Sequence, residues 1–170
     1  SPALLRDICG PAHSHLQHVE QAFADDDVRA ESQGGEIVVT GNGEGARKGA
    51  DVLQAFADRI AQGAEATGAE LEAAIRLTQS HGVAGASGDV IMGLRKPVMA
   101  QTPGQRSYLE KLRRDDLGLI FGVGPAGTGK TFLAVAAGAA ELKAGKRERL
   151  IVARPAVEAG EKLGFLPGAL

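Results

Sequence analysis

The strongest constraint on this chain is the octapeptide at residues 124–131, Gly-Pro-Ala-Gly-Thr-Gly-Lys-Thr. It fits the pattern G-x-x-x-x-G-K-[ST], the Walker A loop that binds phosphate groups between a strand and a helix. Glycines allow backbone angles at which successive N–H groups can point inward at an anion. We expect Lys130 to reach the β- and γ-phosphates and Thr131 to ligate Mg²⁺. The residues predicted to contact the phosphates are Gly124, Pro125, Ala126, Gly127, Thr128, Gly129, Lys130 and Thr131.

A phosphate-binding loop of this kind lies between a strand and a helix, and the segments on both sides of the octapeptide fit these two elements. Residues 117–123 are an apolar run of buried-strand length, and residues 131–144 are Ala-rich, with Gly145 just beyond them. A second apolar run, residues 149–153, follows the predicted helix. Strand, helix and strand in this order predict a βαβ unit with a parallel sheet. The fold class we predict for residues 101–170 is therefore α/β, of the P-loop NTPase type.

A glutamine upstream of the loop predicts which base the nucleotide carries. Residues 102–105, Thr-Pro-Gly-Gln, open a predicted helix that runs to about Arg114. The Gln105 amide offers a donor and an acceptor together, which matches the N6/N7 edge of adenine. It precedes Lys130 by 25 positions, about the separation found in helicase-like ATPases. We interpret Gln105 as an adenine-binding residue, so that ATP with Mg²⁺ is the expected cofactor.

The charge distribution suggests two units with different partners. Residues 1–75 carry 13 acidic and 5 basic side chains (net −8), whereas residues 76–170 carry 8 acidic and 14 basic ones (net +6). We predict a small α+β domain over residues 1–80, a linker with a hairpin over 81–100, and the ATPase part over 101–170. Residues 80–88, at the start of the linker region, are rich in Gly, Ala and Ser and are expected to be flexible. The single cysteine and the lack of a signal peptide or an apolar run of spanning length favour a cytoplasmic protein without a membrane partner.

The N-terminal domain is predicted from periodicity and turn residues. The expected elements are a strand over 4–9, a helix over 13–23, strands over 28–31 and 36–40, a helix over 45–62, and a helix that begins with a Thr67–Glu70 capping box. This order resembles a KH-like fold, but residues 10–13 lack the second glycine of its nucleic-acid-binding loop. A docking or structural domain is the alternative. Cys9 is expected to be buried, and His13, His15 and His18 to be surface residues rather than metal ligands.

Three blocks of the C-terminal half together resemble the PhoH-like ATPase family. They are residues 102–105, residues 122–131, and residues 154–168, which read Arg-Pro-Ala-Val-Glu-Ala-Gly-Glu-Lys-Leu-Gly-Phe-Leu-Pro-Gly. The third block follows the second apolar run, and its Arg154, Glu158 and Lys162 are candidates for a nucleic-acid or coupling loop, with a plain solvated loop as the alternative. The resemblance implies a RecA-type, helicase-like ATPase that acts on RNA or in ribosome maturation. It also implies a homo-oligomeric ring, with a YbeY-type endoribonuclease as a partner.

Hydrolysis needs an acidic residue at the end of another buried strand. The apolar run at residues 149–153 is followed by Arg154 and Pro155, so it does not provide this acid. The chain therefore looks like the front part of an ATPase, and we expect these 170 residues to bind ATP weakly and to turn it over little or not at all. Two other functions stay open at this point. One is a small-molecule kinase built on the same loop, and the other is a non-enzymatic fragment that docks a partner.

Overall fold

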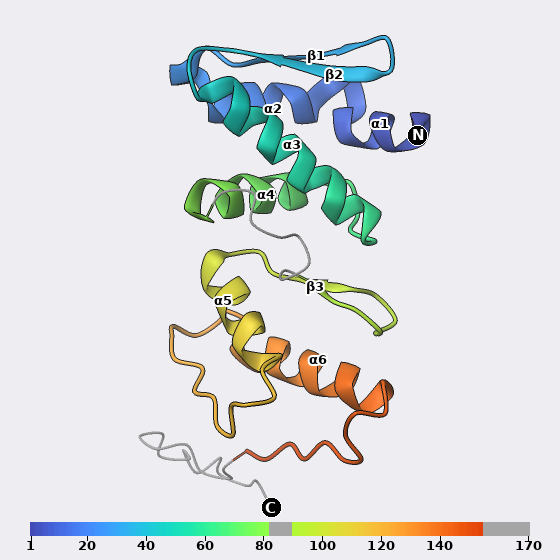
Figure 1. Cartoon of the computed structure of the whole chain (residues 1–170), viewed down its shortest axis with the longest axis vertical. Coiled ribbons are helices and arrows are strands. Elements are labelled where there is room, and N and C mark those ends of the chain that lie inside the picture. Colours follow the sequence, from blue (N-terminus) through green and yellow to red (C-terminus); the bar gives the residue numbers. More distant parts are fainter. Residues whose placement is uncertain (82–89, 155–170) are drawn as a thin grey trace, which may run out of the picture.

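The computed structural model describes residues 1–81 and 90–154 of the chain. Its α-helices are α1 (Pro2–Cys9), α2 (Ser14–Ala22), α3 (Gly45–Ala61), α4 (Gly68–His81), α5 (Pro103–Leu112) and α6 (Lys130–Lys143). Its strands are β1 (Arg29–Gln33), β2 (Glu36–Thr40), β3 (Val90–Ile91) and β4 (Val98–Met99). They form two antiparallel two-stranded sheets, so the described chain is a mixed α/β structure. Along its long axis, helices α1–α4 and the β1–β2 hairpin occupy one half, and β3, α5 and α6 occupy the other (Figure 1). None of the helices in these ranges combines the length and the apolar character needed to cross a membrane.

Residues 1–81 enclose one hydrophobic cluster. Helices α3 and α4 pack against each other, and the β1–β2 hairpin lies at the far end beside α2 (Figure 1). The largest fully buried side chains of this cluster are Phe56, Leu16, Leu71, Val19, Val28 and Val52. Gly34 and Gly35 both have positive φ, as a two-residue hairpin turn requires. The predicted hairpin and the helices α2, α3 and α4 are therefore confirmed, with boundaries within a few residues of those expected.

The strand expected over residues 4–9 is wrong, because this segment is helix α1. Ser1 caps the helix by accepting a hydrogen bond from the N–H of Leu4, and Pro2 occupies its first turn, where a missing N–H costs nothing. Ile8 and Cys9 are buried one turn after Leu4 and Leu5, which is a helical spacing. The described part of the chain thus lacks the first strand of the KH-like order.

The histidines near the N-terminus differ in their surroundings. His15 is buried, and its ring meets that of Phe56 edge-on at a centroid distance of 5.3 Å, so the surface position expected for it is wrong. Its Nδ1 lies 3.1 Å from the carbonyl oxygen of Asp7. His18 lies 3.1 Å from a carboxylate oxygen of Glu72. Within residues 1–81 and 90–154, no group of three or more histidine, cysteine or acidic side chains is arranged to hold a metal ion. Cys9 is buried, as predicted.

A second hydrophobic cluster joins α5, α6 and the β3–β4 hairpin. Its buried members are Ile91, Ala100, Leu109, Leu133 and Ala136. Through this cluster α5 packs against α6 (Figure 1). Gln105 in the first turn of α5 contacts Thr128, two residues before α6. The hairpin and both helices are confirmed as predicted. The division into domains stays a prediction, and residues 82–88 of the linker expected to be flexible lie outside the described residues.

The parallel sheet expected around the glycine-rich loop is not found in the described residues. Residues 117–123 and 149–154 have no strand structure, and Phe121, Val123 and Ile151 are 78%, 93% and 77% exposed. The two predicted buried strands are therefore wrong for this structure. A strand exists only when a neighbouring strand satisfies its backbone N–H and C=O groups. An apolar run predicts burial, but it carries no information on whether a pairing strand is within reach.

Candidate nucleotide-binding site

The glycine-rich loop lies directly before α6, as predicted. Gly127 and Gly129 have φ values of 77° and 83°, which residues with a Cβ atom rarely adopt. Helix α6 begins at Lys130 with Gly129 as its N-cap, so the N–H groups of its first turn have no acceptor within the helix. These N–H groups and the positive end of the helix dipole favour an anion in front of the helix.

The Lys130 ammonium group lies over the loop that precedes it. Its Nζ donates to the carbonyl oxygens of Gly124 (2.9 Å) and Pro125 (2.6 Å) and to Oγ1 of Thr128 (3.2 Å). Thr128 Oγ1 in turn donates to the Pro125 carbonyl oxygen at 3.0 Å. All three acceptors of the lysine are neutral oxygens. Because hydrogen bonds to charged oxygens are about twice as strong, a phosphate oxygen in the same place would be a better partner for this cation.

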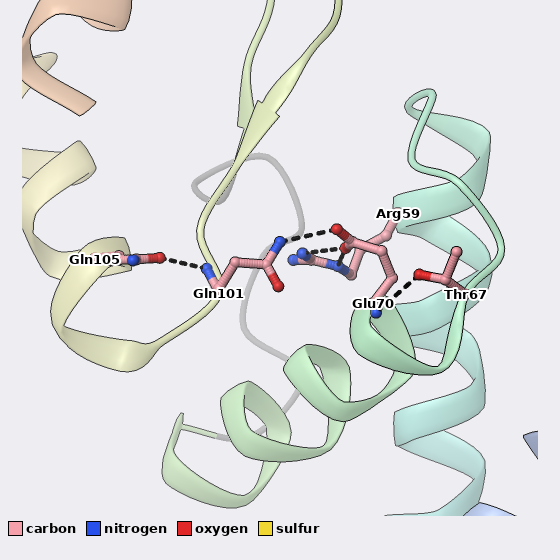
Figure 2. A network of polar contacts seen from close by, with 5 residues as sticks. All are labelled: Arg59, Thr67, Glu70, Gln101 and Gln105. Carbon is pink, nitrogen blue, oxygen red and sulfur yellow. Dashed lines mark hydrogen bonds and ion pairs between the residues drawn. The ribbon is translucent and has the colours of Figure 1, made fainter. Parts of the chain in front are cut away.

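Gln105 contacts the same loop from the first turn of α5. Thr102 caps this helix, and its Oγ1 accepts the Gln105 N–H at 3.2 Å. The side-chain Nε2 of Gln105 donates to the carbonyl oxygen of Thr128 at 3.2 Å, and its Oε1 accepts the backbone N–H of Gln101 at 2.6 Å (Figure 2). A Cβ atom at position 129 would lie 3.3 Å from Gln105 Nε2, so glycine there leaves room for the amide.

A pocket of about 370 Å³ lies between the loop and α5. The residues expected to bind the nucleotide that line it are Gln105, Gly124, Pro125, Thr128 and Lys130. Tyr108 and Phe121 add aromatic surface, and Lys111 adds a second cation. Among the described residues, no acidic side chain lines this pocket. Two lysines without a carboxylate, next to aromatic rings, provide both electrostatic attraction for phosphate and a surface for a base.

A larger pocket, of about 560 Å³, lies away from the loop, between β3 and the C-terminal half of α6. Its lining is mainly aliphatic, with residues such as Ile91 and Ala137. It contains neither Gln105 nor Lys130. The smaller pocket is the candidate site because its chemistry suits a nucleotide. It brings together the Lys130 ammonium group, the N-terminus of α6 and the Gln105 amide.

The other predicted site residues lie outside this pocket. Thr131 is an exposed residue in the first turn of α6 and does not line the pocket. Ala126 and Gly127 form the exposed tip of the loop. Arg154 is exposed at the end of the described residues, and Glu158 and Lys162 lie beyond them, so the predicted coupling loop is not described by this structure.

Comparison with known proteins identifies the segment that contains the site. The family model described as PhoH-like protein matches residues 97–170. The chain is therefore similar to the PhoH-like family over residues 97–170. This PhoH-like segment includes α5, the glycine-rich loop and α6, but none of the helices α1–α4.

Several bacterial proteins are similar to part of this chain. The chain is 55% identical over 75 residues to the PhoH-like protein of Bacillus subtilis and 53% identical over 73 residues to that of Synechocystis. It is 42% identical over 72 residues to the protein PhoH of Escherichia coli. These alignments cover 44%, 43% and 42% of this chain, and only 23%, 22% and 20% of the respective relatives. No solved structure matches the chain significantly.

A polar network connects the PhoH-like segment to the N-terminal helices. The Gln101 side-chain Nε2 donates to Oε1 of Glu70 at 2.8 Å (Figure 2). The other carboxylate oxygen of Glu70 accepts from Nη2 (2.5 Å) and Nε (2.9 Å) of Arg59, whose side chain is 4% exposed. The sequence predicted Glu70 only as a capping-box residue, and Thr67 Oγ1 does accept the Glu70 N–H at 3.4 Å. No local pattern predicts the longer connections, because Gln101 and Glu70 are 31 positions apart.

Proposed function

We propose that the PhoH-like segment binds Mg·ATP in the pocket between the glycine-rich loop and α5. One observation carries this proposal. Gln105 and Lys130, predicted separately to contact the base and the phosphates, both contact Thr128 and line the same pocket. The proposal assigns residues 101–170 to the nucleotide-binding part of a P-loop ATPase.

The phosphate end of the nucleotide would bind where Lys130 now contacts the loop. Its ammonium group would exchange neutral oxygens for phosphate oxygens, and the N–H groups of the first turn of α6 would donate to the same anion. Thr131 would provide the hydroxyl that ligates Mg²⁺, and this ion would neutralise charge on the phosphates. Lys111 at the edge of the pocket adds attraction for the nucleotide as it approaches.

The adenine end would bind Gln105. Each of its amide atoms makes one hydrogen bond to protein, and each has capacity for another. The second hydrogen of Nε2 can donate to N7 of adenine, and the second lone pair of Oε1 can accept from the N6 amino group. Tyr108 and Phe121 offer ring faces on which the purine can pack.

For a longer protein that contains this segment, we propose ATP hydrolysis as well as ATP binding. The resemblance supports ATP hydrolysis coupled to RNA or ribosome maturation in the cytoplasm, in a homo-oligomeric ring and with a YbeY-type endoribonuclease as a partner. The net charge of +6 on residues 76–170 is compatible with RNA as a target. Among the described residues the pocket has no carboxylate to position a metal-bound water, which supports binding with little turnover by this chain alone.

Calorimetric titration of the 170-residue chain with Mg·ATP tests the proposal, with Lys130→Ala as the variant and Lys143→Ala as the matched control. Both lysines are on α6, but Lys143 is in its last turn, away from the loop. Loss of a charge-assisted hydrogen bond should weaken binding by Lys130→Ala about 10-fold to 100-fold. Lys143→Ala should bind like the wild type. A wild-type chain that does not bind Mg·ATP, or a Lys130→Ala variant with unchanged affinity, contradicts the proposal.

A further inference from the structure

The amide of Gln105 is held in one orientation by two backbone groups. The Gln101 N–H can only donate and the Thr128 carbonyl can only accept, so Oε1 must face the first and Nε2 the second. This orientation leaves one acceptor position and one donor hydrogen of Gln105 for a ligand. Adenine offers the matching pair at N6 and N7, whereas guanine has acceptors at both O6 and N7.

Discrimination between the two purines therefore depends on the amide being unable to turn. An amide free to rotate could direct both hydrogens of Nε2 at guanine. With Oε1 held against the Gln101 N–H, the remaining lone pair of Oε1 would face O6 of guanine, and two acceptors repel each other. The contact between Gln101 and Gln105, at 2.6 Å, is the shorter of the two that fix the amide.

Gln101 is itself held from outside the PhoH-like segment. Its side chain donates to Oε1 of Glu70, on the first turn of α4 (Figure 2). Arg59 on α3 binds only Oε2 of the same carboxylate, so the two oxygens have separate partners. The side chains of Arg59 and Glu70 are 4% and 19% exposed, and α3 packs against α4 around a buried core. The Gln101 side chain is thus held by a well-packed part of residues 1–81, the N-terminal unit, and this contact restrains the neighbouring Gln101 N–H.

We propose that Gln101, with Glu70 and Arg59 behind it, is a positioning residue that sets the base specificity of the nucleotide site through Gln105. None of the three needs to touch the nucleotide. The N-terminal helices thereby take part in choosing adenine over guanine, although they lie outside the segment that holds the loop. This inference rests on the proposed binding of ATP by Gln105 and Lys130.

The test compares Mg·ATP and Mg·GTP affinities of the 170-residue chain and of Gln101→Met by calorimetry. Methionine keeps the backbone N–H and the approximate length of the side chain but cannot donate to Glu70. The affinity for Mg·ATP should fall about threefold to tenfold, the effect of one weakened hydrogen bond, and that for Mg·GTP should stay the same or rise. The preference for ATP over GTP therefore falls, which a general loss of structure would not produce.

Glu65→Gln is the matched control. It removes the ion pair between Glu65 and Lys96 (3.2 Å), which also joins the N-terminal unit to the β3–β4 hairpin but has no contact with Gln105. It should leave both affinities unchanged. Because Glu70 is partly exposed, water can replace the lost donor, and far-UV circular dichroism should show that Gln101→Met is folded.

The outcomes separate this inference from the function on which it rests. A wild-type chain that binds ATP without preferring it to GTP, or that binds neither, overturns the assignment of Gln105 and the inference with it. A wild-type chain that prefers ATP, with the same preference in Gln101→Met, overturns only the inference. An equal loss of affinity for both nucleotides in Gln101→Met also overturns it, because that result indicates a structural role alone.

Discussion

The ion pair between Arg59 and Glu70 gives a sharp test of how the N-terminal unit is held together. Both hydrogen bonds that Arg59 makes to this carboxylate go to the same oxygen, at 2.5 and 2.9 Å. A third nitrogen, Nη1, is buried without a hydrogen-bond partner among the described residues. Replacing Glu70 with leucine preserves much of the side-chain volume and removes the acceptor. It therefore leaves a guanidinium group, on a side chain that is 4% exposed, without its counter-charge.

Breaking one partner of a buried ion pair costs about 3–5 kcal/mol, because the remaining charge stays desolvated. Glu70 is 19% exposed, so water can reach part of the site and the lower end of this range applies. We expect Glu70→Leu to lose about 3 kcal/mol. Arg59→Met should lose less, since the remaining carboxylate keeps the Gln101 amide as a donor and has some access to water. Arg59→Met combined with Glu70→Leu should return to within about 1 kcal/mol of the wild type.

Urea denaturation followed by far-UV circular dichroism measures these differences. With a slope of about 1–3 kcal/mol per molar urea, a loss of 3 kcal/mol moves the midpoint down by about 1–3 M. The double variant closes a thermodynamic cycle from which the coupling between the two side chains follows directly. A loss below about 1 kcal/mol in Glu70→Leu, or a double variant as unstable as that single variant, would refute the reasoning from the buried charge.

Two further predictions concern local structure. Gly10→Ala should destabilise the chain by about 2 kcal/mol or more, because Gly10 has a φ of +72° and an added Cβ would lie 2.6 Å from Cγ of His15. The matched control Gly68→Ala, with open space around it, should be nearly neutral in the same urea assay. The hydrogen bond from Arg114 holds the pKa of Asp116 below its ordinary value, so this contribution to stability is present above the unfolded-state pKa and is lost as the pH falls through the folded-state pKa. An NMR titration should show the Asp116 pKa rising in Arg114→Gln, and an unchanged value would contradict this assignment.

The elements that sequence reasoning predicted well are those with local determinants. The hairpin turn at Gly34 and Gly35 needs two positive φ values, and glycine provides them without help from distant residues. Helix α5 begins at Thr102 and Pro103, whose capping and fixed φ both favour a helix start. The loop and α6 were predictable for the same reason, since the glycines and the Ala-rich run act over one or two turns.

The wrong predictions have different causes. The apolar run at residues 117–123 matches a buried strand in composition, but a strand forms only beside another strand, which the run itself cannot specify. Residues 4–9 form a helix and not the predicted strand, and here the local signal is present in the sequence. Leu4, Leu5, Ile8 and Cys9 recur at helical spacing, and Ser1 and Pro2 favour a helix start. The predicted capping box at Thr67–Glu70 is correct for one of its two hydrogen bonds, because Thr67 Oγ1 accepts the Glu70 N–H. The Glu70 carboxylate, which would complete the box, binds Arg59 and Gln101 instead.

The contacts of Glu70 with Arg59 and Gln101 couple the two halves of the chain. If the carboxylate fixes Gln101, and Gln101 fixes the amide that binds adenine, then binding of ATP must in turn favour the arrangement in which Glu70 and Gln101 are joined. This reciprocity is a thermodynamic requirement for any two linked contacts and needs no change of shape. The charge asymmetry of the chain therefore does not imply two independent units. The Glu70 carboxylate of the acidic N-terminal half accepts a hydrogen bond from the Gln101 side chain of the basic half, which contains the glycine-rich loop.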